Sequence, residues 1–267
     1  MKVSKFEVVS ITFLITLLAW WVYIYFVLNA ENLSQNLAWG ATYQLMAWWG
    51  GVFGLISSRI WGWFKSRMGR AILFFSIGLL LQGFGQTAFS YYNIILHSDI
   101  PYPSVADLGY FLSVIFYILG ILTLARVVGT TFSIQAFTGK LIAFIVPALM
   151  LGISYTIFLR DYQYDWSAPL RTFLDFGYPL GEAIYVSIAI IALLSARTML
   201  GGIMRTPILV VIFALIAQYV AEFNFLEQAH NGTWINGGYG DALYLLSYFI
   251  MSVSLIKIDA ALRHQEK

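Results

Sequence analysis

Long runs of apolar residues, separated by short polar segments, make up most of the chain. Eight of these runs have the length of about 17–25 residues that an α-helix needs to cross the hydrocarbon core of a bilayer. They cover residues 7–29, 38–58, 71–92, 105–125, 141–159, 179–196, 207–226 and 239–257. The pattern therefore predicts an all-α polytopic membrane protein, with eight transmembrane helices in a single domain at residues 1–267.

The composition excludes most other classes of protein. Hydrophobic residues make up 60% of the chain and charged residues 10%, whereas soluble domains have about 45–50% and about 25%. A soluble fold of 267 residues could not bury so much apolar surface, and disorder is excluded because polar residues are scarce. The chain has no cysteine, so disulfides and thiolate metal sites are absent. A net charge of +2 gives no indication of nucleic-acid binding.

The basic residues are distributed unevenly between the two sides of the predicted bundle. With eight helices, 13 of the 15 Lys and Arg residues fall on one side, and only Arg160 and Arg171 fall on the other. Lys and Arg accumulate on cytoplasmic loops, so we expect a multi-pass protein of the cell membrane with both termini in the cytoplasm. Removing one helix from the count would reverse every later loop and destroy this segregation.

A short motif recurs near the start of the fourth, sixth and eighth predicted helices. Each copy contains a small residue, an acid, two further residues and a tyrosine. The acid–tyrosine pairs are Asp107 and Tyr110, Glu182 and Tyr185, and Asp241 and Tyr244. The simplest organisation is four hairpin repeats, each running outward on an odd-numbered helix and returning on an even-numbered one.

The third and seventh predicted helices also resemble each other. Gln82 and Gln86 match Gln218 and Glu222, and each pair has the i, i+4 spacing that places two side chains on one helix face. These side chains are candidates to join the acids of the even-numbered helices.

The three acids have two interpretations. Capping explains Asp107, because Ser104 precedes it by three residues as in a capping box. Capping explains Glu182 and Asp241 less well, because neither follows such a residue, and it does not explain the recurrent tyrosines. Ionisable groups within membrane spans normally face the bundle interior or an aqueous cavity. We therefore expect a polar ligand-binding pocket in the outer leaflet, built from the three acid–tyrosine pairs and the four side chains of the odd-numbered helices.

The sequence PSVADLGYFL at residues 103–112 resembles a motif of a known group of proteins. It is similar to the multi-span membrane regions of bacterial and archaeal signalling proteins, in which a Pro-Ser-x-Ala-Asp-x-x-Tyr motif starts a helix. Those regions usually precede diguanylate cyclase, phosphodiesterase, PAS or histidine kinase domains and are regarded as sensory. The resemblance implies a prokaryotic sensor that passes a signal through residues 258–267 to a cytoplasmic partner or output domain. We expect either a module of a larger signalling protein or a chain that acts with a separate partner.

Other functions stay open at this point. Repeated hairpins and intramembrane carboxylates also suit a small transporter or proton-coupled carrier, and the chain could be an accessory subunit of a membrane complex. We expect no enzymatic activity, because no catalytic constellation is visible. Beyond the lipid bilayer, a second copy of the chain is a candidate partner, since Gly50 and Gly54 form a helix-packing motif.

A metal site is the weakest of the candidates. His97, Asp99 and His230 lie on predicted outer loops, and imidazole with carboxylate suits zinc, copper or iron. No cofactor is otherwise indicated by the sequence.

Overall fold

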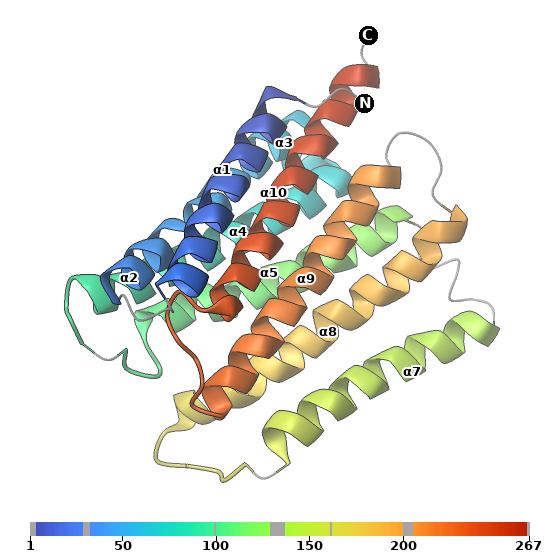
Figure 1. Cartoon of the computed structure of the whole chain (residues 1–267). Coiled ribbons are helices and arrows are strands. Elements are labelled where there is room, and N and C mark those ends of the chain that lie inside the picture. Colours follow the sequence, from blue (N-terminus) through green and yellow to red (C-terminus); the bar gives the residue numbers. More distant parts are fainter. Residues whose placement is uncertain are drawn as a thin grey trace.

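The computed structural model describes residues 4–28, 33–98, 100–128, 137–160, 162–199 and 205–265, apart from the side chains of 128, 137–138, 195–199, 230 and 259–265. Regular structure in these ranges is entirely helical (Figure 1). Seven helical segments are long and apolar enough to cross a membrane. They belong to α1 (Lys5–Val22) with η1 (Tyr23–Val27), α4 (Arg67–Ile94), α5 (Val105–Val128), α7 (Phe137–Ser154) with η3 (Tyr155–Leu159), α8 (Pro169–Met199), α9 (Arg205–His230) and α10 (Tyr239–Gln265). The expected all-α class is confirmed, and the helices suit a multi-pass membrane protein.

The second predicted span, residues 38–58, is not the single helix that the apolar pattern suggests. It is divided into α2 (Leu33–Thr42) and α3 (Leu45–Ile60), each too short to count as a span by itself. The backbone stays paired across the break, because the Tyr43 N–H donates to the Trp39 carbonyl at 3.1 Å. The Gln44 side chain donates to the Ala41 carbonyl at 2.8 Å and so satisfies an acceptor beside the break. Such pairing allows a helix to be interrupted within a membrane, and the count of eight spans stays a prediction.

Six helices form a closed ring around the core. In order, α3, α4, α5, α8, α9 and α10 each pack against the next, and α10 returns to α3. On the outside, α1 packs mainly against α10, and α7 packs against α8 (Figure 1). Only 6% of the most apolar window of residues 139–159 is buried, against 61% for 239–258. The outer helices therefore present their apolar side chains to lipid, while the ring encloses the interior.

Three of the four expected hairpins consist of helices that pack against each other. The pairs are α4 with α5, α7 with α8, and α9 with α10 (Figure 1). The first hairpin differs, because α1 makes few contacts with α2 and α3 and packs on the last helix instead. The fourfold repeat therefore stays a prediction.

The sixth predicted span starts much earlier than its apolar pattern indicates. We expected it to begin at residue 179, but α8 begins at Pro169 and contains Pro179 in its interior. Proline is favoured in the first turn of a helix, because backbone N–H groups there have no partner within the helix and proline has no N–H to leave unpaired. Pro169 occupies such a position. Internal proline is tolerated in membrane helices, where neighbouring groups satisfy the freed backbone. Glu182 consequently lies more than three turns inside α8 and cannot cap it.

Close helix packing fills the half of the ring that lies towards the chain termini. A Cβ atom on Gly50 would lie 1.9 Å from the Ser252 Oγ, and one on Gly54 would lie 2.0 Å from the Ser76 Oγ. These glycines let α3 approach α10 and α4, as small residues do at membrane helix contacts. The Gly-x-x-x-Gly motif is thus used within one chain.

The orientation in the membrane follows from the basic residues and can be tested directly. The termini lie at one end of the bundle, and the loops at residues 95–104 and 231–238 lie at the other (Figure 1). Because the chain has no cysteine, Thr233→Cys and Phe64→Cys each introduce a single thiol at an exposed position. In intact cells, a membrane-impermeant maleimide should label Thr233→Cys and leave Phe64→Cys unlabelled until the membrane is permeabilised. Labelling of Phe64→Cys in intact cells would reverse the predicted orientation.

Candidate functional site

A cavity of about 520 Å³ lies inside the ring, at the end of the bundle opposite the chain termini. Side chains from the α2–α3 break, η3, α4, α5, α8, α9 and α10 line it, together with residues of the loops before α5, α8 and α10. Its volume is within the range of about 300–1,000 Å³ that is usual for small-molecule sites. The ring therefore encloses a space that a small ligand could occupy.

The cavity brings together most of the residues that the sequence singled out. Its lining includes all three motif acids, two of the motif tyrosines and three of the side chains expected from the odd-numbered helices: Asp107, Glu182, Asp241, Tyr110, Tyr244, Gln82, Gln86 and Glu222. Tyr185 and Gln218 do not line the cavity, and both donate to the carboxylate of Glu222, which does. Ligand binding by these ten residues stays a prediction.

Glu222 on α9 is the centre of a buried hydrogen-bond network. Its Oε1 accepts from the Gln82 Nε2 at 3.0 Å and from the Gln218 Nε2 at 2.9 Å, and its Oε2 accepts from the Tyr185 hydroxyl. The donors come from α4, α9 and α8. Because polar groups within a bilayer must find their partners in the protein, these hydrogen bonds fix three helices relative to one another.

The two glutamines extend the network to α5 and α10. The Gln82 Nε2 also donates to the Ser113 Oγ at 2.8 Å, while its Oε1 accepts from the Tyr248 hydroxyl at 3.0 Å. The Ser247 hydroxyl donates to the Gln218 Oε1 at 2.5 Å. The α4–α5 and α9–α10 hairpins therefore each contain a glutamine that is hydrogen-bonded to a serine three residues after the motif tyrosine.

Asp107 and Asp241 lie near the starts of their helices and have capping partners. The Asp107 Oδ2 accepts from the Ser104 N–H at 2.6 Å, and its Oδ1 accepts from the Tyr178 hydroxyl at 3.0 Å. The Asp241 Oδ2 accepts from the Gly237 N–H at 2.7 Å. Both acids thus combine a capping role with a place in the cavity wall.

Glu182 differs from the other acids of the cavity. Its side chain is 2% exposed and lines the cavity, yet no hydrogen bond or ion pair reaches its carboxylate from the described part of the chain. Glu222, which lines the same cavity, is also an acid and therefore cannot serve as a counter-ion for Glu182. A buried charge without a partner is costly, so the surroundings of Glu182 are incomplete in the free protein.

Aromatic rings form a connected series along the cavity. The Trp234 ring lies 5.4 Å from that of Phe89 and 6.1 Å from that of Phe225, and the Phe225 ring lies 6.4 Å from that of Tyr244. The Tyr244 ring lies 5.9 Å from that of Tyr248. All five line the cavity, so its carboxylates face a largely aromatic surface.

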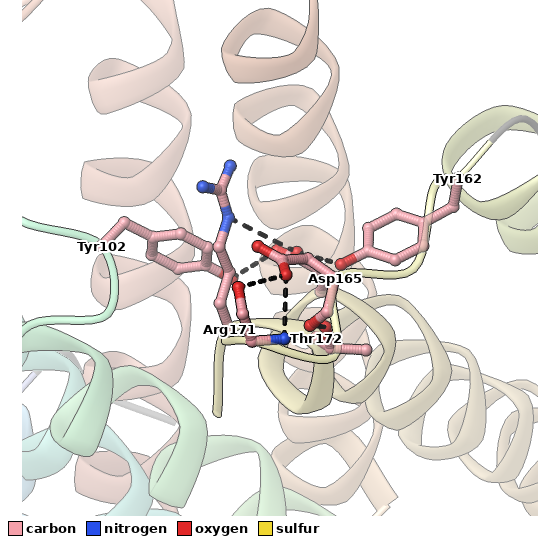
Figure 2. Close-up of polar contacts among 7 residues, drawn as sticks. Tyr102, Tyr162, Asp165, Arg171 and Thr172 are labelled. Atoms are coloured by element: carbon pink, nitrogen blue, oxygen red, sulfur yellow. Dashed lines mark hydrogen bonds and ion pairs between the residues drawn. The ribbon is translucent and has the colours of Figure 1, made fainter. Parts of the chain in front are cut away.

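A polar cluster lies at the rim of the cavity, where Figure 2 shows Tyr102 and Tyr162 on either side of Arg171. Both tyrosine hydroxyls donate to the Asp175 carboxylate at 2.7 Å, and the Arg171 Nε lies 3.9 Å from the same carboxylate. The Arg171 guanidinium also lies 5.8 Å from the centre of the Tyr102 ring. Burial, followed by the hydrogen bond to Asp175, raises the pKa of Tyr102 well above its ordinary value. Tyr102 therefore stays a neutral donor that joins the loop before α5 to α8.

The outer loop before α8 is stabilised by its own contacts. The Ser167 N–H donates to the Asp165 Oδ1 at 2.9 Å, and the Thr172 hydroxyl donates to the Asp165 carbonyl at 3.0 Å (Figure 2). The hydrogen bonds from Ser167 lower the pKa of the exposed Asp165 below its usual value. This acid does not line the cavity.

The metal site expected at His97, Asp99 and His230 stays a prediction. Among the described residues, no group of three or more His, Cys, Asp or Glu side chains is placed to hold a metal ion. His97 is exposed, while Asp99 and the side chain of His230 lie outside the described residues.

Several cavity residues carry no signal in the sequence that separates them from ordinary interface aromatics. Tyr178 and Tyr248 lie in α8 and α10 and donate to Asp107 and Gln82, and Tyr43 marks the α2–α3 break. Tyr43 has a partial signal, because it follows Gly40 in the second predicted span by the same three residues that separate the acid from the tyrosine in the motif. The rim residues Arg171 and Asp175 could not have been recognised, because they precede the predicted span.

Comparison with protein-family models, with curated proteins and with solved structures finds no match to the chain. Its function is therefore inferred from the cavity and its lining.

The importance of the Glu222 network can be measured with a single hydroxyl deletion. Tyr185→Phe removes one donor to Glu222 and keeps the buried ring, so it should lower the free energy of unfolding by about 1 kcal/mol. Tyr117→Phe is a matched control. Its ring lies 6.0 Å from that of Tyr185, and no hydrogen bond of its hydroxyl is found within the described residues. Equal effects of the two variants on unfolding in mixed detergent micelles would contradict this role of Glu222.

Proposed function

We propose that the protein is an integral membrane sensory or ligand-binding module. It takes up a small molecule from the side of the membrane opposite the chain termini. The observation that supports this proposal most directly is the cavity of about 520 Å³ with buried carboxylates and an aromatic wall. Small-molecule sites are typically concave and mostly apolar, with a few convergent polar groups.

The closed half of the ring supports binding rather than passage. The residues lining the cavity come from one end of the bundle, while Gly50 and Gly54 bring α3 into close contact with α10 and α4 towards the other end. A ligand that enters the cavity would therefore be held, and any effect at the far end would have to travel through the helices.

The last helix offers a route for such an effect. At the cavity it contributes Asp241, Tyr244 and Tyr248, and near its other end the Lys257 Nζ lies 3.7 Å from the Glu7 Oε1. Glu7 belongs to the capping box at the start of α1. The proposed output at residues 258–267 includes the end of this helix, which is described as far as Gln265, and the side chains after residue 258 lie outside the described residues. The resemblance at residues 103–112 favours the same sensory role.

A transporter is the second candidate, and one observation favours it. The break between α2 and α3 lies beside the cavity, because Tyr43 lines it. Interrupted helices at a central binding site are typical of secondary transporters. Transport would require the packed half of the ring to open, whereas ligand binding requires no such change.

Signal transmission can be tested by filling the cavity. Leu226→Trp enlarges a side chain that lines the cavity, while Ala148→Trp makes a comparable change at an exposed position on α7. If occupancy is transmitted along α10, Leu226→Trp should change amide hydrogen exchange at residues 250–258 and 4–8 by about fivefold or more, the low end of typical coupling. Ala148→Trp should leave both segments unchanged.

The comparison is made on both variants in detergent, with thermal unfolding used to show that each is folded. Changes in exchange confined to the surroundings of residue 226 would contradict a sensory role.

A further inference from the structure

The cavity contains a buried carboxylate that has no counter-ion. Glu222 accepts three hydrogen bonds, and Asp107 and Asp241 both accept from backbone N–H groups. Glu182 is 2% exposed and lines the cavity without any such donor from the described chain. Because intramembrane charges are normally paired, the missing partner of Glu182 is expected to come from a ligand.

The charges that surround the cavity favour a cationic ligand. Five of the described lining residues are acidic: Asp107, Asp175, Glu182, Glu222 and Asp241. Arg171 is the only basic residue among them. It lies at the rim with a side chain that is 58% exposed, and it is paired with Asp175. The interior therefore attracts positive charge and would repel an anion.

The aromatic wall indicates what kind of cation fits. A bare metal ion needs a compact set of ligands, and none is present among the described residues. Phe225, Trp234 and Tyr244 instead provide ring surface in the same cavity as Glu182. Aromatic rings attract ammonium groups and also pack against apolar bodies.

We infer that the cavity binds an organic ammonium ion with an apolar or aromatic body, and that the Glu182 carboxylate is its counter-ion. This inference rests on the proposed function, because it names the ligand class of the same cavity. Ammonium groups occur both on free amines and on lipid headgroups, so the experiment must distinguish these two sources.

The test uses the full chain in an uncharged detergent with three probes of similar size. Phenethylammonium carries the charge, 2-phenylethanol is its neutral analogue, and phenylacetate is an anionic one. Calorimetric titration should show phenethylammonium binding at least about tenfold more tightly than 2-phenylethanol, and no binding of phenylacetate. Measurable binding of the first two probes with equal affinities would overturn the inference.

Two variants assign the preference to Glu182. Glu182→Gln removes the charge with little change of shape and should make the affinities for phenethylammonium and 2-phenylethanol nearly equal. Asp165→Asn is the matched control, because it removes an acid on the same end of the molecule that does not line the cavity. It should keep the tenfold preference. Loss of the preference in both variants would assign it to the general surface charge and overturn the role of Glu182.

A chemical probe keeps the inference testable if Glu182→Gln does not fold. Leu226→Cys places a single thiol in the cavity wall, and Thr233→Cys places one at an exposed position outside it. A methanethiosulfonate reagent with a trimethylammonium group should react faster with Leu226→Cys than one with a sulfonate group. The ratio of the cationic to the anionic reaction rate should be at least about tenfold higher at Leu226→Cys than at Thr233→Cys. Equal ratios at the two positions would overturn the inference.

The source of the ammonium group is decided by competition. Each competitor is tested for whether it slows the reaction of Leu226→Cys with the trimethylammonium reagent. Protection by monomeric dihexanoylphosphatidylcholine, without protection by phenethylammonium, would support a lipid headgroup as the source. Protection by phenethylammonium supports a free amine, and protection by neither would overturn the inference. If Leu226→Trp transmits its effect to the far end but no ammonium ion binds preferentially, the ligand class is wrong and the proposed function stands.

Discussion

The arrangement of the helices depends on one constraint: a polar group inside a bilayer must find its partner in the protein, because water is absent there. Glu222 meets this constraint with donors on α4, α8 and α9, and Gln82 continues the contacts to Ser113 on α5 and Tyr248 on α10. Five of the six ring helices are therefore joined through one connected set of hydrogen bonds. Apolar packing alone would set no such register, since lipid is as apolar as the helix surfaces.

The same constraint divides the interior into two parts with different properties. Where small residues such as Gly50 and Gly54 meet serines, the helices pack closely and leave little space. Where large aromatic residues and carboxylates meet, the helices enclose a cavity. Glu182 belongs to the second part and has an incomplete set of partners, while Glu222 has a complete one. One acid thus supports the structure, and the other is available for a ligand.

The membrane helices could be predicted because apolar length is a local property of the sequence. The three acids of the acid–tyrosine motif all line one cavity, while the repeat and its role in ligand binding stay predictions. The α2–α3 break was not predicted, because it depends on contacts made by Tyr43 and Gln44 after folding. The start of α8 was placed too late, because Arg171 and Asp175 lower the apolar content of its first turns. Tyr185 was expected to line the pocket, because its spacing from Glu182 places both on one helix face, but it does not. Its hydroxyl donates to Glu222 on another helix, and spacing along one helix cannot predict a partner on another.

The pairing of the first helix with the last has a consequence for biosynthesis. A ribosome releases α1 long before α10, so during synthesis Glu7 has no Lys257 and α1 lacks the helix on which it mainly packs. The most apolar 18-residue window within residues 5–27 has a mean hydropathy of 2.0, which allows the segment to remain inserted before the last helix is made. The side-chain oxygens of Gln218 and Gln82 likewise lack their donors, Ser247 and Tyr248, until α10 is made. Insertion of the last helix therefore closes the ring, and a nascent chain halted before it would leave unpaired amides within the lipid.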